Sequence, residues 1–270
     1  MSLLTSKQSS EKEQAAHIYS PEYYARLAEM DERHWWSLGV RAIATKLLDR
    51  YAPTTRDWKV LDAGCGTGLT LSWLKRYTDI EPMGFDLSRS GLEFCAQRDH
   101  KQLVETSTLA IPFASEYFDL VVSLDVLQHL PRPGGDRDAL SEIARVVKRG
   151  GLFLLRTNSA CGYPPTKQED YQRYALSEIC TILTDAGFQI EIATYINFLP
   201  GLLATARQLV AQPNTRNTDP GLGMIPRPPE SSLITRLMYL ALQAESAYLA
   251  PGRPALPFGH SILALAQKSI

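Results

Sequence analysis

The chain has 270 residues, of which 44% are hydrophobic and 21% charged, a composition typical of one or two globular domains with a sizeable core. Lysine and arginine number 28 against 29 for aspartate and glutamate, so the net charge of −1 argues against a nucleic-acid-binding protein. Four widely spaced cysteines without a Cys-x-x-Cys pair, and the lack of any apolar run of about 18 residues, predict a cytoplasmic protein without disulfides, zinc or membrane span.

The first part of the chain predicts helices rather than strands. Residues 1–16 are polar and charged, and we expect them to be disordered. A helix is expected from Ser20, which can cap it ahead of Pro21, and a second from about residue 37 to 51. Residues 17–51 would then form a helical lid in front of a single domain that comprises residues 52–270.

From residue 58 onward, short apolar strands alternate with helices. The segment 118–124 is almost wholly apolar, which is typical of a parallel strand covered on both faces. Repeated βα units predict an open, doubly wound α/β fold with ligands outside the carboxyl ends of the strands. The expected strands are 58–62, 82–86, 102–105, 118–124, 152–155, 188–198 and 261–267, and the helices between them are 69–77, 87–99, 136–148 (stopped by Gly150 and Gly151) and 174–186.

Residues 200–258 interrupt this pattern before the last strand. The segment begins and ends in stretches rich in proline and glycine, and it contains an expected helix at about 231–249. That helix either packs on the sheet, caps a ligand pocket or forms a homodimer contact. Its expected apolar stripe consists of Leu233, Leu237, Leu240, Ala244 and Tyr248.

A glycine-rich turn joins the first expected strand to its helix. In residues 60–68, VLDAGCGTG, the three glycines allow a ligand to approach the backbone at a helix N-terminus. The spacing departs from the dinucleotide fingerprint, because Leu69 stands where its third glycine would be. Asp62 precedes the turn, where its carboxylate would repel a pyrophosphate but attract an ammonium group.

Asp86 ends the next expected strand, about 20 residues after the glycines, where such folds place an acidic group on ribose hydroxyls. These three features fit S-adenosylmethionine. Asp62 would face its amine, the glycines would lie against its uncharged segment, and Asp86 would bind its ribose. NAD fits only the ribose contact, so a nicotinamide oxidoreductase is disfavoured. No His, Cys and carboxylate cluster has metal-ligand spacing, and no metal is expected.

Four motifs within residues 58–157 resemble those of class I S-adenosylmethionine-dependent methyltransferases, in the small-molecule branch called type 11. They are LDAGCGTG at 61–68, GFDLS at 84–88, IPF at 111–113 and FDLVVSLDVLQH at 118–129. The resemblance implies a seven-stranded, mostly parallel Rossmann-like sheet with an antiparallel last strand. It also implies S-adenosylmethionine as cofactor and a small-molecule methyl acceptor, with O- or N-methylation favoured.

Two alternatives to a small-molecule enzyme follow from the same comparison. A nucleic-acid methyltransferase is disfavoured, because no Asn/Asp-Pro-Pro-Tyr motif follows the strand 118–124. A protein that binds the cofactor in a regulatory or structural role, without chemistry, stays open.

The resemblance also implies which residues hold the cofactor. The glycine turn would lie against the methionine moiety, Asp86 would bind the ribose, and the backbone near Ser123 would approach the methionine end. Ser107 replaces the family's usual aspartate on the adenine amino group. The expected cofactor contacts are Trp36, Arg41, Asp62, Gly64, Cys65, Gly66, Gly68, Asp86, Leu87, Ser107, Thr108, Leu109, Ser123 and Leu124.

Residues 34–41 resemble the N-terminal lid of relatives, in which an arginine such as Arg41 binds the cofactor carboxylate. Trp36 either closes over the cofactor or anchors its helix. His129 follows the strand 118–124 and is the candidate catalytic base, although it could equally bind backbone, and Asp125 competes with it. The Tyr- and Pro-rich residues 156–174 are a candidate acceptor loop.

Overall fold

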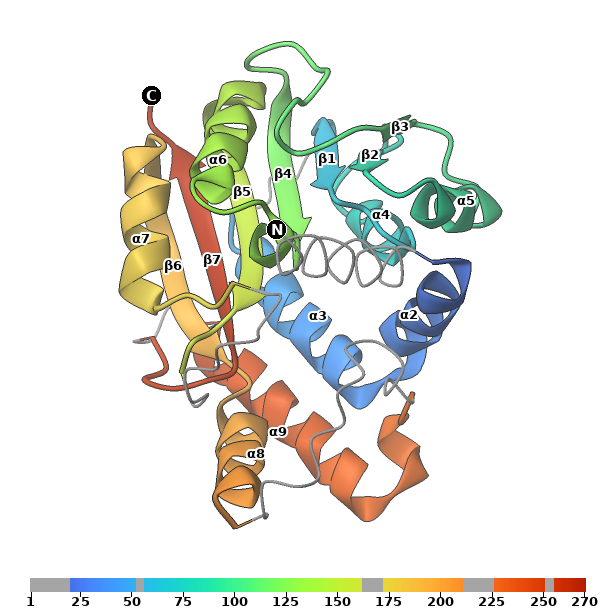
Figure 1. Ribbon diagram of the computed structural model, residues 1–270, viewed down its shortest axis with the longest axis vertical. Helices are drawn as coiled ribbons and strands as arrows, with labels where there is room; N and C mark the ends of the chain where they lie inside the picture. Colours follow the sequence, from blue (N-terminus) through green and yellow to red (C-terminus); the bar gives the residue numbers. More distant parts are fainter. Residues whose placement is uncertain (1–19, 52–55, 162–171, 211–225, 251–254) are drawn as a thin grey trace, which may run out of the picture.

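A computed structural model describes residues 20–51, 56–161, 172–210, 226–250 and 255–270, with the side chains of 207–210 excepted. Its centre is a seven-stranded sheet in the order β3-β2-β1-β4-β5-β7-β6 (Figure 1). All neighbouring strands are parallel except β7, which is antiparallel to both β5 and β6. The strands are β1 (Val60–Ala63), β2 (Met83–Asp86), β3 (Leu103–Glu105), β4 (Phe118–Leu124), β5 (Val147–Asn158), β6 (Phe188–Ile196) and β7 (Ser261–Lys268).

This sheet confirms the predicted α/β fold with its antiparallel last strand. The expected disordered start at residues 1–16 lies outside the described residues. Most of the candidate acceptor loop, residues 162–171, lies outside them as well.

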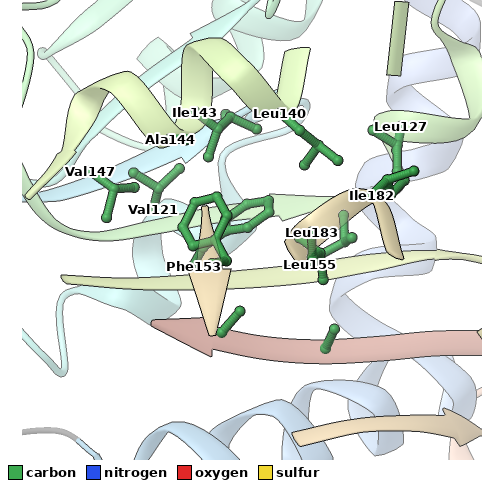
Figure 2. Packing of buried hydrophobic residues seen from close by; sticks show 14 of the residues in the cluster. Val121, Leu127, Leu140, Ile143, Ala144, Val147, Phe153, Leu155, Ile182 and Leu183 are labelled. Atoms are coloured by element: carbon green, nitrogen blue, oxygen red, sulfur yellow. The ribbon is translucent and has the colours of Figure 1, made fainter. Parts of the chain in front are cut away.

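Helices cover both faces of the sheet, because the central strand is apolar on both sides. Val121 of β4 faces a cluster with Phe153 and residues of α6 (Gly135–Val146) and α7 (Leu176–Asp185), as Figure 2 shows. Leu120, one residue earlier, faces the opposite cluster with α3 (Trp35–Leu48) and α9 (Leu233–Leu249). Two further helices, α4 (Leu69–Leu74) and α5 (Arg89–Gln97), follow β1 and β2.

The helix expected at 136–148 and the strand expected at 152–155 have different bounds in the structure. α6 ends at Val146, and β5 continues from Val147 through both glycines. The glycines do not interrupt the strand but let it bulge: Gly150 has φ +73, and the pairing of β4 with β5 shifts register between Phe118 and Leu120. The sequence pattern alone treated these glycines as a helix stop.

The helical segment before the sheet contains α2 (Pro21–Arg33) and α3. Ser20 caps α2 by accepting a hydrogen bond from the Tyr23 amide, as expected. α3 begins two residues earlier than expected, because the His34 side chain caps it by accepting from the Trp36 amide at 3.1 Å. α3 packs on the sheet and on α9, whereas α2 lies against α3, α4 and α5 near the carboxyl ends of the strands (Figure 1).

Among its described residues, the insertion before β7 contains two longer helices rather than one. α8 (Phe198–Val210) was not expected from the sequence, and it includes Pro200 and Gly201. Both lie in the first turn of the helix, a place where proline is tolerated. Glu245 of α9 accepts hydrogen bonds from the Asn197 and Phe198 amides at 2.8 and 3.0 Å, and so fixes α8 to α9.

The apolar stripe expected on α9 is wrong, because it lies mostly on the exposed side of the helix. Leu233 is 72% exposed, and Leu237 and Leu240 are each 51% exposed. α9 has apolar residues on several sides, so hydrophobicity alone did not identify the buried one. The buried positions include polar groups that find partners, such as the Ser246 hydroxyl, which donates to the Ala42 carbonyl oxygen at 3.2 Å. The insertion helix therefore packs on α3.

Within the described ranges, no helix combines the length and the apolar character needed to cross a membrane.

Candidate functional site

A cavity of about 660 Å³ opens at the carboxyl ends of β1, β2, β4 and β5, beneath α2 and α3. This is the edge of the sheet where a doubly wound fold binds its ligands. Of the expected cofactor contacts, those that line the cavity are Trp36, Arg41, Gly64, Cys65, Gly66, Asp86, Leu87, Ser107, Thr108, Leu109 and Leu124, and the expected base His129 lines it too.

The glycine turn forms one wall of the cavity and requires glycine for its conformation. Gly64, Gly66 and Gly68 have φ values of +87, +50 and +80, in the left-handed region. A Cβ atom on Gly66 would meet nothing within 4 Å, so this position opens directly into space that a ligand can fill. The Gly64 and Cys65 amides both donate to the Phe85 carbonyl oxygen at 2.9 Å and hold the turn against β2.

Asp86 stands at the end of β2 with its carboxylate turned toward the glycine turn. Its Oδ2 atom accepts from the Gly66 amide at 2.8 Å, and Oδ1 accepts from the Ser88 amide at 2.8 Å. The Tyr24 hydroxyl of α2 donates to Oδ1 at 3.4 Å. Burial raises the pKa of Asp86, while these hydrogen bonds oppose the shift. Oδ2 retains a lone pair that can accept from a ligand hydroxyl.

Two exposed leucines flank the cavity next to Asp86. Leu87 is 60% exposed and Leu109 is 36% exposed, although both side chains are large and apolar. Ser107 lies beside them, and its hydroxyl oxygen accepts from the Leu109 amide at 3.2 Å. Two apolar walls with a small polar group between them suit a flat heterocycle.

Three of the expected contacts lie behind the cavity wall. Gly68 does not line the cavity but turns the chain into α4. The Ser123 hydroxyl donates to the Ala63 carbonyl oxygen at 3.1 Å and so links β4 to β1. Asp62 is 1% exposed and lies beneath the turn, and its Oδ2 atom has no hydrogen-bond partner among the described residues. Burial, with the nearby charges of Asp86 and Asp31, raises the pKa of Asp62 well above its ordinary value.

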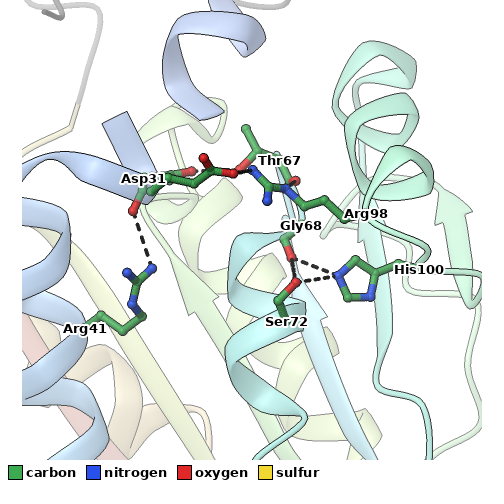
Figure 3. Close-up of polar contacts among 8 residues, drawn as sticks. Asp31, Arg41, Thr67, Gly68, Ser72, Arg98 and His100 are labelled. Atoms are coloured by element: carbon green, nitrogen blue, oxygen red, sulfur yellow. Dashed lines mark hydrogen bonds and ion pairs between the residues drawn. The ribbon is translucent and has the colours of Figure 1, made fainter. Parts of the chain in front are cut away.

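The front helices bring two opposite charges to the cavity, Asp31 and Arg41 (Figure 3). The Asp31 carboxylate of α2 accepts from the Thr67 hydroxyl, within the turn, at 2.8 Å. The Arg41 guanidinium of α3 donates to the main-chain oxygen of Asp31 at 3.4 Å. Arg98, directly after α5, completes the junction, because it donates to the Thr67 carbonyl oxygen at 2.8 Å and pairs with Glu32 of α2 at 2.5 Å.

A second charged group stands at the ends of β4 and β5. Arg156 forms a two-point ion pair with Asp125, which has φ +60 directly after β4. The Arg156 guanidinium lies 4.8 Å from the centre of the Trp36 ring, so the pair also contacts α3. A non-glycine residue held at positive φ beside a cavity is typical of a functional site.

His129 ends the short 3₁₀ helix η1 (Leu127–His129), and its side chain faces the same cavity. Burial lowers the pKa of His129, and the charge of Asp125 opposes this effect. The imidazole is therefore uncharged at neutral pH and able to accept a proton. In the described part of the chain, no three His, Cys, Asp or Glu side chains gather as metal ligands would.

Sequence reasoning did not name Asp31 or Thr67 as cavity residues, and it included Arg156 only as the first residue of the candidate acceptor loop. Arg156 carried a signal, because it follows an expected strand at its carboxyl end. Asp31 carries no such signal, since its role depends on how α2 crosses the glycine turn.

Residues 61–155 match the family model described as a methyltransferase domain. The chain is 32% identical over 100 residues to the tRNA (carboxymethyluridine(34)-5-O)-methyltransferase of Arabidopsis thaliana. This match covers 36% of this chain and 23% of that protein. The chain is 31% identical over 145 residues to the fatty-acid O-methyltransferase of Mycolicibacterium smegmatis, and this match covers 52% of this chain and 47% of that protein. The chain thus spans less than half the length of either curated relative.

The fold is also similar to a solved structure of phosphoethanolamine N-methyltransferase 2 from Haemonchus contortus, in complex with phosphomonomethylethanolamine and S-adenosylhomocysteine. The TM-score is 0.54 at 20% identity, and the match covers 84% of this chain and 53% of that chain. At this identity the similarity concerns the fold.

Proposed function

We propose that this chain, whose residues 61–155 are a class I S-adenosylmethionine-dependent methyltransferase domain, transfers the methyl group of that cofactor to an oxygen or nitrogen atom of a small molecule. The resemblance drawn from its four motifs is confirmed by the family match. The observation that carries the proposal is one cavity lined by the glycine turn and Asp86 together with Asp125, His129 and Arg156.

The residues of the cavity fit S-adenosylmethionine. Gly66 leaves an open cradle beside the turn, and Asp86 keeps an acceptor position for a ribose hydroxyl. Arg41 is a half-buried cation for which the described residues supply no ion-pair partner, and burial lowers its pKa. A ligand carboxylate would relieve this cost, so Arg41 fits the carboxylate of the methionine moiety. Leu87 and Leu109 fit the two faces of the adenine.

The cofactor, when bound, supplies an electrophilic methyl group on a sulfonium. The chain's own contribution is to exclude water, orient the acceptor and accept its proton. His129 is suited to the last task, because a lowered pKa keeps its imidazole unprotonated at neutral pH. The Asp125–Arg156 pair, fixed against Trp36, would hold the acceptor side of the cavity in one geometry.

A small acceptor is favoured over a nucleic acid by the enclosure of the site. α2 and α3 contribute Tyr23, Leu27, Trp36 and Val40 to the cavity wall, and its volume of about 660 Å³ lies in the range of small-molecule pockets. The net charge of −1 supplies no overall basic surface for a phosphate backbone. The tRNA methyltransferase relative makes tRNA the acceptor that a test must include.

The direct test is to incubate the chain with S-adenosylmethionine labelled on the methyl group and a panel of phenols, fatty acids, amines and tRNA. We expect label in one of the small molecules and none in tRNA. Transfer to tRNA alone would reject the small-molecule acceptor, and absence of both transfer and S-adenosylhomocysteine binding would reject the enzyme.

Asp86→Ala tests the ribose contact, with Asp79→Ala as its matched control. Charge-assisted hydrogen bonds contribute about 1.5–3 kcal/mol, so the Kd for S-adenosylhomocysteine should rise roughly tenfold to a hundredfold. Asp79→Ala, an exposed aspartate outside the cavity, should leave that Kd unchanged. An unaltered Kd in folded Asp86→Ala would contradict the ribose assignment.

His129→Asn tests the proton acceptor. With a hydroxyl acceptor, loss of a general base lowers kcat by about a hundredfold or more, while S-adenosylhomocysteine still binds. An unchanged kcat would mean that His129 has only a structural role or that the acceptor needs no base.

A further inference from the structure

The cavity is lined by a carboxylate and a guanidinium that do not pair with each other. Arg41 reaches the main-chain oxygen of Asp31, at 3.4 Å, rather than its carboxylate (Figure 3). The carboxylate instead accepts from the Thr67 hydroxyl at 2.8 Å, which fixes its Oδ2 atom at the turn. Both residues line the cavity. Two opposite charges held side by side, and both turned to one cavity, complement a ligand that carries an anion and a cation close together.

The other arginines near Asp31 already have acidic partners. Arg156 is paired with Asp125 through two hydrogen bonds, and Arg98 with Glu32 at 2.5 Å. In the described part of the chain, no ion pair joins Asp31 or Arg41 to another side chain. Their charges are therefore the ones that a ligand must compensate at this end of the cavity.

Asp62, the carboxylate that the sequence placed beside a ligand amine, is poorly suited to this task. It lies behind the glycine turn, outside the cavity wall. Burial and the nearby carboxylates of Asp86 and Asp31 also raise its pKa, which disfavours the negative charge that an ammonium group needs.

We propose that Asp31 binds the α-ammonium group of the cofactor's methionine moiety, next to the carboxylate held by Arg41, and so makes the site specific for ligands with an intact amino-acid end. This inference rests on the proposed function and concerns the same cavity. It makes α2, which lies outside the matched methyltransferase domain, a specificity element for the cofactor.

The ionisation of Asp31 gives a second consequence. Burial raises the pKa of Asp31 to about 6, and the charge of Asp125 acts in the same direction. The Thr67 hydroxyl, Arg156 and Arg41 oppose the shift. An ammonium group in contact favours the carboxylate and lowers this pKa again. Ligand binding near pH 6 therefore releases protons, and affinity falls as the pH drops below about 6.

The test compares two ligands, S-adenosylhomocysteine and its analogue in which hydrogen replaces the α-amino group. Calorimetry at about pH 8 should show that the native chain binds S-adenosylhomocysteine roughly tenfold to a hundredfold more tightly than the analogue. Asp31→Asn, which keeps the shape of the side chain, should lose this preference.

Glu32→Gln is the matched control, because it removes the neighbouring charge of α2 from a residue that pairs with Arg98 and does not line the cavity. It should retain the preference for S-adenosylhomocysteine. A folded Asp31→Asn variant that keeps the preference would overturn the assignment.

A second measurement needs no variant. Binding heats for S-adenosylhomocysteine, measured in two buffers of different ionisation enthalpy, report the protons released. Release of about half a proton at pH 6, and of almost none at pH 8, is expected. The absence of release at pH 6 would contradict the role of Asp31.

Failure of the two proposals can be distinguished. If S-adenosylhomocysteine does not bind the native chain, both proposals are wrong. If it binds without preference over the analogue that lacks the amino group, the methyltransferase proposal stands and the Asp31 assignment falls.

Discussion

The two helices before the first strand, α2 and α3, are neighbours in the sequence but have different tasks in the molecule. α3 buries seven of its fourteen residues, and five of these pack in the cluster with β4, β5, β7 and α9, namely Val40, Ile43, Ala44, Leu47 and Leu48. α2 buries only Tyr24 and Ala28 among thirteen residues, and it meets the glycine turn through the polar side chain of Asp31. α3 is therefore part of the core and also supplies cavity residues such as Arg41, whereas α2 contributes to the cavity wall with little burial of its own.

Because of this difference, the two helices of the lid expected at residues 17–51 cannot be treated as one moving unit. A lid that moves as one unit would have to detach Ile43 and Leu47, both 0% exposed, from the sheet. Such a movement exposes the core and is costly. α2 can move at much lower cost, because polar contacts form much of its attachment to the glycine turn.

The largest expected effect is the loss of stability when a buried side chain of α3 is removed. Leu47→Ala removes a fully buried side chain of α3, and large-to-small changes at such positions cost 2–5 kcal/mol, so we expect a loss of about 3 kcal/mol in unfolding free energy. Denaturant titration measures it.

Leu27→Ala of α2 is the counterpart of this substitution, because Leu27 is half-buried and lines the cavity. It should lower the unfolding free energy by less than about 1 kcal/mol and weaken ligand binding instead. Equal losses of stability for the two variants would remove the distinction between the helices.

A smaller effect is expected in the amide hydrogen exchange of α2. Without ligand, the amide hydrogens of residues 21–33 should exchange much faster than those of residues 35–48, because α2 opens locally. With S-adenosylhomocysteine at about a hundred times its Kd, exchange in α2 should slow by up to roughly a hundredfold. Equal exchange of α2 with and without the ligand would show that this helix is a fixed brace.

Sequence patterns located each strand of the sheet, although β5 is much longer than expected and the antiparallel last strand was implied only by the family resemblance. β4 has the bounds expected from its apolar run, and the glycine turn and Asp86 stand at the strand ends where the spacing placed them. The signal failed where burial depends on a partner far away in the chain. The buried side of α9 includes Glu245 and Ser246. Their hydrogen-bond partners are Asn197, between β6 and α8, and Ala42 of α3.

The residues of the candidate site were predictable where they belong to local motifs, but not where they depend on tertiary contacts. Residues carried by local motifs, such as Gly64, Gly66 and Asp86, line the cavity. Asp31 does so only because α2 crosses the glycine turn, a tertiary contact for which the sequence has no local pattern. Asp62 shows the reverse, since its motif is clear but its side chain lies behind the turn.

Gly39 of α3 and Leu242 of α9 are in contact, so the packing of these two helices has to wait until both have been synthesised. A Cβ atom on Gly39 would overlap the Leu242 side chain, so the two helices touch at this point although about 200 residues separate them. At about 5–20 residues per second, a ribosome needs roughly 10–40 s to travel between them. During that interval the apolar face of α3 lacks part of its native cover. The period of greatest vulnerability to misassembly therefore opens when α3 leaves the ribosome and closes only once α9 and β7 have followed.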